Sequence, residues 1–128
     1  MKKIFIWIAI IGFIIFIGLA GFTFSKIYHS VERITDIAKN EFEGNAIESL
    51  IELVNSKNHS IREKNTAIWA LGQIADEKAL PFLEKINSET DQNSPCNLSN
   101  TICKGEIEKA IKWCKKGNLT SWMYRKIK

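Results

Sequence analysis

Three cysteines are the residues of this chain with the clearest chemical potential. Cys96 lies in a polar stretch, and Cys103 and Cys114 follow it at spacings that lack the Cys-x-x-Cys pair of zinc and thioredoxin-like sites. If residues 103–114 form one helix, Cys103 and Cys114 lie about 16 Å apart, whereas a disulfide needs Cα atoms within roughly 7 Å. The alternatives left open are a Cys96–Cys103 disulfide, a Cys96–Cys114 disulfide or three thiols. We take Cys96 and Cys103 as the candidate pair.

No other set of side chains matches a catalytic or metal-binding pattern. His29 and His59 are far apart in sequence, and neither has a carboxylate or cysteine at metal-ligand spacing. The sequence has no glycine-rich phosphate loop and no Ser/His/Asp or Cys/His grouping. Carboxylates one turn apart, such as Glu48 and Glu52, are typical of a solvated helix face. We therefore expect no catalytic residue, no metal and no cofactor, and predict that the protein is not an enzyme.

The N-terminal segment is apolar. No charged residue occurs from Ile4 to Phe24, and lysines flank the run on both sides. A helix of this length spans roughly 31 Å, close to the hydrocarbon thickness of a bilayer. A helix that is apolar on every side is typical of a membrane span and not of the surface of a small soluble domain. The sequence therefore predicts a single-pass transmembrane anchor at residues 1–26.

A cleaved secretory signal is the alternative for this segment, with Gly18-Leu19-Ala20 as an acceptable cleavage site. The apolar run continues beyond that site to Phe24, which favours a retained anchor. Lys2 and Lys3 favour a cytoplasmic N-terminus, although basic residues also follow the span. We therefore expect residues 27–128 to lie outside the cytoplasm.

Residues 27–128 show helical spacing of apolar residues and lack the alternation typical of strands. Ser60 and Glu63 form a capping-box pattern, and the polar segment 87–101 predicts a loop. Helices are expected near residues 28–41, 46–55, 61–75, 77–86 and 104–115. The predicted fold class is all-α: an N-terminal transmembrane helix followed by a short α-hairpin helical repeat bundle.

The most specific pattern of this helical region lies in residues 60–83. It contains a hydrophobe-Arg entry, an Ala-x-x-Ala-Leu-Gly run, then Asp and Ala-Leu-Pro-x-Leu, carried by Ile61-Arg62, Ala67, Ala70-Leu71-Gly72, Asp76, Ala79-Leu80-Pro81 and Leu83. The segment resembles one unit of the HEAT-like repeats of the bilin-lyase type, and a shift of roughly 33 residues reveals a faint internal repeat. The resemblance covers about a quarter of the chain and implies a protein-binding scaffold, without bilin chemistry. We expect small Ala67 and Ala70 to let the following helix pack closely, and Gly72 to be either a close-contact position or a local weakness.

The C-terminal segment is basic, since residues 101–128 hold eight Lys and Arg against two Asp and Glu. The simpler interpretation is that Trp113 and Trp122 cover the helical stack while the lysines keep it soluble. The alternative is contact with a lipid surface, through Lys115, Lys116, Trp122 and Arg125. We expect no nucleic-acid partner.

The expected function is that of a membrane-anchored helical-repeat scaffold or adaptor, which binds an unidentified protein by surface complementarity. Trp69 and Phe82 are the residues expected to contact that partner. The alternatives are a secreted, disulfide-linked helical domain left after signal cleavage, and an accessory subunit of an enzyme.

Overall fold

The computed structural model describes residues 2–91 and 95–127, and all regular secondary structure in these ranges is helical. The all-α fold class is thereby confirmed. The chain divides into two compact units, residues 1–30 and residues 31–128. This boundary lies slightly beyond the predicted end of the anchor at residue 26.

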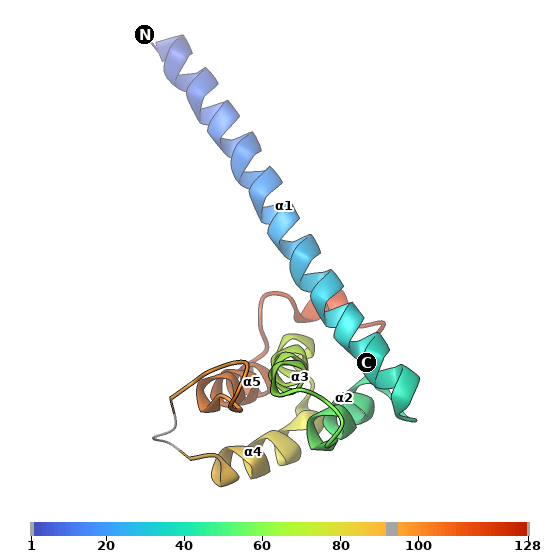
Figure 1. The fold of residues 1–128 in the computed structure, drawn as a ribbon. Coiled ribbons are helices and arrows are strands. Elements are labelled where there is room, and N and C mark those ends of the chain that lie inside the picture. The colour runs from blue at the N-terminus through green and yellow to red at the C-terminus, as the bar shows by residue number, and fades with distance from the viewer. Residues whose placement is uncertain (1, 92–94, 128) are drawn as a thin grey trace. The chain divides into compact units, whose positions relative to one another are not determined.

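The N-terminal helix α1 is one uninterrupted helix of 40 residues, Lys2–Glu41 (Figure 1). We had expected a separate helix to begin near residue 28, but residues 25–30 contain no glycine or proline that would end the first one. Fourteen large apolar side chains between Ile4 and Phe22 are 44–71% exposed. Helix α1 is therefore long and apolar enough to cross a bilayer.

The second unit contains four further α-helices and two short 3₁₀ helices. In chain order they are α2 (Ala46–Asn55), α3 (Ile61–Ile74), η1 (Glu77–Ala79), α4 (Leu80–Glu89), α5 (Lys104–Lys116) and η2 (Ser121–Tyr124). The predicted bounds of α2 are confirmed, and so is the capping box of Ser60 and Glu63 at the start of α3. A second capping box, formed by Asn45 and Glu48, begins α2.

A histidine, His59, links the end of α1 to the start of α3. The His59 side chain is only 7% exposed, and its Nε2 lies 2.9 Å from Oε2 of Glu41. Its Nδ1 lies 3.6 Å from the Glu63 carboxylate. The Ser60 hydroxyl, followed by the Ser60 backbone N–H and the nearby His59, holds the pKa of Glu63 below its ordinary value.

Helix α3 is the central element of the second unit. It packs against α5 on one side and α2 on the other, while α4 packs mainly on α5 (Figure 1). We had expected α4 to be the helix that packs closely on α3, and this expectation is wrong: α5 takes that position. The fully buried side chains at the centre include Leu50, Leu53, Ile68, Leu71, Ile74, Leu83 and Ile107.

A glycine permits the close approach of α3 and α5. A Cβ atom added to Gly72 would lie 2.8 Å from the Cα of Ala110 and 2.9 Å from Cε3 of Trp113. Both distances are shorter than real Cβ contacts, and one of them involves backbone. Gly72 is therefore a close-contact position, one of the two alternatives that the sequence left open.

We predict that Gly72→Ala lowers the free energy of unfolding of residues 31–128 by about 1–3 kcal/mol, because the added methyl group separates α3 from α5. The measurement is a urea titration of the full chain in detergent micelles, followed by circular dichroism. Gly105→Ala in the first turn of α5 is the matched control, because nothing lies within 4 Å of its added Cβ. Equal losses from the two substitutions would contradict the close-contact role.

Candidate functional site

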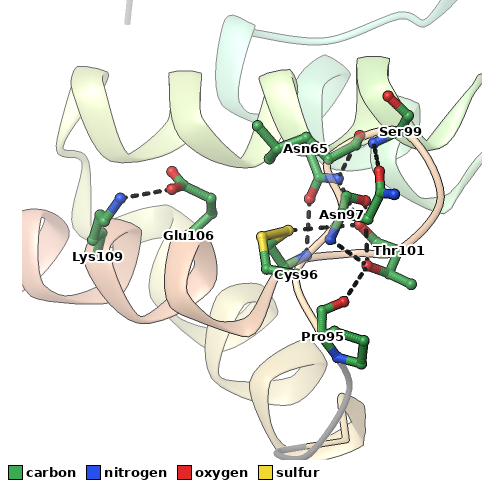
Figure 2. The surroundings of a disulfide bond; sticks show 10 residues. Asn65, Pro95, Cys96, Asn97, Ser99, Thr101, Glu106 and Lys109 are labelled. Carbon is green, nitrogen blue, oxygen red and sulfur yellow. Dashed lines mark hydrogen bonds and ion pairs between the residues drawn. A yellow bond between two sulfur atoms is a disulfide. The ribbon is translucent and has the colours of Figure 1, made fainter.

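Residues 95–103 lie directly before α5, and we call them the loop. A disulfide bond between Cys96 and Cys103 closes this loop (Figure 2). The Cα atoms are 4.9 Å apart, within the range that a disulfide requires. Cys114 lies on α5, where its buried thiol donates a hydrogen bond to the carbonyl of Leu71. Of the pairings that the sequence left open, the structure therefore shows Cys96–Cys103, the candidate pair.

One buried side chain attaches this loop to α3. The Nδ2 of Asn65 donates to the carbonyl oxygens of Leu98, at 3.1 Å, and Thr101, at 2.8 Å. Its Oδ1 accepts from the backbone N–H of Cys103 at 3.0 Å (Figure 2). Asn65 is 3% exposed, so water does not compete strongly for these groups. A single amide thus fixes both the loop and the start of α5 against α3.

The loop is also ordered by hydrogen bonds of its own. The Thr101 hydroxyl accepts from the backbone N–H of Asn97 and lies 3.2 Å from the carbonyl oxygens of Pro95 and Asn97. The side chain of Asn97 accepts from the backbone N–H of Ser99 in an Asx turn. These hydrogen bonds fix the loop conformation, so the loop forms one wall of a groove beside α3.

Between this wall and α3 lies a groove with a volume of about 310 Å³. Arg62, Thr66 and Trp69 are spaced by four and three residues along α3, so they occupy one helix face. Leu98 from the loop and Glu106 from α5 complete the lining, together with Asn65. The groove combines apolar surface from half-buried Trp69 and from Leu98 with charges of both signs.

The structure separates the two residues expected to contact a partner. Trp69 lines the groove, whereas Phe82 is partly exposed on α4 and is absent from the groove lining that the structure describes. Asn65 and Leu98 escaped sequence reasoning, because their roles depend on contacts between segments far apart in the chain. The only signal in the sequence was the position of Asn65, a polar amide on the side of α3 that faces the core.

The basic segment is divided between packing and exposure. Trp113 packs against Gly72, as the simpler interpretation expected. That interpretation is wrong for Trp122, whose side chain is 64% exposed. Lys115 forms an ion pair with Glu84 of α4 at 2.6 Å. Two other residues from the lipid-contact alternative, Lys116 and Arg125, are exposed.

Comparisons with known proteins found no match for this chain among protein-family models, curated proteins or solved structures. The similarity of residues 60–83 to a HEAT-like unit therefore stays a prediction from the sequence. Within residues 2–91 and 95–127, no cluster of three or more His, Cys, Asp and Glu side chains is placed to hold a metal ion.

We predict that Asn65→Leu lowers the free energy of unfolding by about 2–4 kcal/mol, because it leaves the buried N–H of Cys103 and two loop carbonyls without their partner. The same urea titration measures this loss. Asn55→Leu, at the exposed last residue of α2, is the control and should change the free energy by less than about 0.5 kcal/mol. If both variants behave alike, Asn65 does not fix the loop.

Proposed function

We propose that this protein is a membrane-anchored binding module. In this proposal, α1 anchors residues 31–128 to a bilayer, and the groove beside Trp69 receives a segment of a partner protein. The observation that carries the proposal is Trp69, a half-buried aromatic side chain that lines the groove. The loop that forms the opposite wall is fixed by Asn65 and by the disulfide.

The groove has the properties of a protein-binding site. Buried aromatic anchors supply much of the binding energy at protein interfaces, and Trp69 offers such an anchor beside Leu98. Arg62 and Glu106 carry opposite charges that can set the direction of a bound segment, although Glu106 also pairs with Lys109 at 2.6 Å. Because the loop is already ordered, little conformational entropy is lost when a partner binds. A scaffold or adaptor role, without catalysis, fits these properties best.

The disulfide supports a position outside the cytoplasm for residues 31–128. Disulfides persist in oxidising compartments and are rare in the reducing cytoplasm. The Cys96–Cys103 bond closes one wall of the groove. The proposed binding site would therefore be complete only on the oxidising side of the membrane.

Photocrosslinking tests the groove. We predict that p-benzoylphenylalanine at position 66, in cells that produce the full chain, forms a discrete covalent adduct with a protein. The same probe at Lys57, an exposed residue outside the groove lining, should give about tenfold less. Trp69→Ala should abolish the adduct at position 66, because truncating an aromatic anchor costs about 2 kcal/mol or more of binding free energy.

Circular dichroism of the Trp69→Ala variant separates loss of binding from loss of fold. An equal yield at positions 66 and 57 would contradict the proposal. So would an adduct at position 66 that persists in a folded Trp69→Ala variant.

A further inference from the structure

A second surface lies at the C-terminal end of the chain, and we call it the C-terminal surface. It consists of Lys116, Leu119, Trp122, Arg125 and Lys126, all exposed. Leu119 is 76% and Trp122 64% exposed, the largest values among the large apolar side chains described in residues 31–127. Apolar side chains this exposed gain free energy when they leave water for an apolar environment.

The exposure of these side chains is built into a fixed segment. Asn118 donates from Nδ2 to the carbonyl oxygens of Gly72, at 2.8 Å, and Gln73, at 3.1 Å, at the end of α3. Thr120 hydrogen-bonds the Gln73 side chain, and Tyr124 of η2 is fully buried. The backbone that carries Leu119 and Trp122 is therefore held against α3 while both side chains point into solvent.

The helical geometry places an apolar side chain and a cation together. A 3₁₀ helix has three residues per turn, so Trp122 in η2 and Arg125 directly after it project on the same side. Lys116 and Lys126 flank this turn in sequence. Residues 109–128 contain seven Lys and Arg and no Asp or Glu. The C-terminal surface thus combines two exposed apolar side chains with three exposed basic residues, of which Lys126 also lines a hollow with Glu32 and Asp36 of α1.

We propose that the C-terminal surface binds an anionic lipid bilayer, with Leu119 and Trp122 inserted among the headgroups and the three cations against lipid phosphates. Tryptophan with basic residues is the combination that favours the bilayer interface. Only six residues, 25–30, separate Phe24 from the second unit. Because these six residues continue helix α1, they span only about 9 Å and keep the second unit close to the bilayer that α1 would enter, so a weak contact suffices. The inference rests on the proposed anchoring by α1 but is independent of the groove.

The test uses the purified full chain in bilayer nanodiscs of phosphatidylcholine alone, or of an equimolar mixture with phosphatidylglycerol. p-Benzoylphenylalanine replaces Leu119, and lipid adducts are counted by mass spectrometry. Position 57 is the aqueous control, and position 14, within the apolar run, reports whether α1 is inserted. We expect lipid adducts at position 119 to be about tenfold more abundant in the anionic bilayer, and to be absent at position 57.

Charge reversal at three positions, K116E, R125E and K126E together, should reduce the adduct at position 119 to the yield at position 57. The charge-conserving triple variant K116R, R125K and K126R should keep it, and circular dichroism verifies that both variants fold. Adducts at position 14 without any at position 119 would overturn this inference and leave the anchor intact. No adducts at position 14 would overturn both. A protein adduct at position 119 in cells, without lipid adducts in nanodiscs, would show a protein-binding surface and overturn the lipid assignment.

Discussion

The exclusion of apolar side chains from water governs the N-terminal part of this chain. Fourteen large apolar side chains of α1 are exposed, and burying each contributes about 1.5–3 kcal/mol, so the total reaches tens of kcal/mol. This total exceeds the net stability of a small domain, about 5–15 kcal/mol, so leaving all these side chains in water would be strongly unfavourable. A lipid bilayer removes these side chains from water, and a helix can enter it because the helix satisfies its own backbone hydrogen bonds.

The second unit faces the opposite problem, since a domain of this size has a thin core. The contacts that compensate for this thin core are concentrated on α3. Gly72 lets α5 approach closely, Asn65 fixes the loop before α5, and Asn118 fixes the segment after it. The disulfide adds a covalent link beside Asn65. These contacts fix the backbone of the groove and of the C-terminal surface, so both proposed binding surfaces are already formed before a partner or a bilayer binds.

Local physics made part of this structure predictable. The helical class, the bounds of α2 and the Ser60 capping box follow from periodicity and short-range hydrogen bonds. For the cysteines, helix geometry excluded only the Cys103–Cys114 pairing. The sequence made Cys96 and Cys103 the candidate pair but left a Cys96–Cys114 disulfide and three thiols open, because the distances between these side chains depend on the tertiary fold. The contacts of Asn65 and the packing of α5, instead of α4, on α3 join segments that are distant in sequence. They depend on tertiary packing, which residue spacing does not encode.

Alkaline carbonate extraction of cell membranes, followed by intact-mass measurement, tests the central claim that α1 is a retained lipid anchor. We expect the protein to stay with the membranes, to be released only by detergent, and to have a mass that includes the apolar segment Ile4 to Phe24. Recovery in the carbonate supernatant would contradict it. So would a polypeptide shortened near Ala20, which would mark the apolar segment as a removed signal.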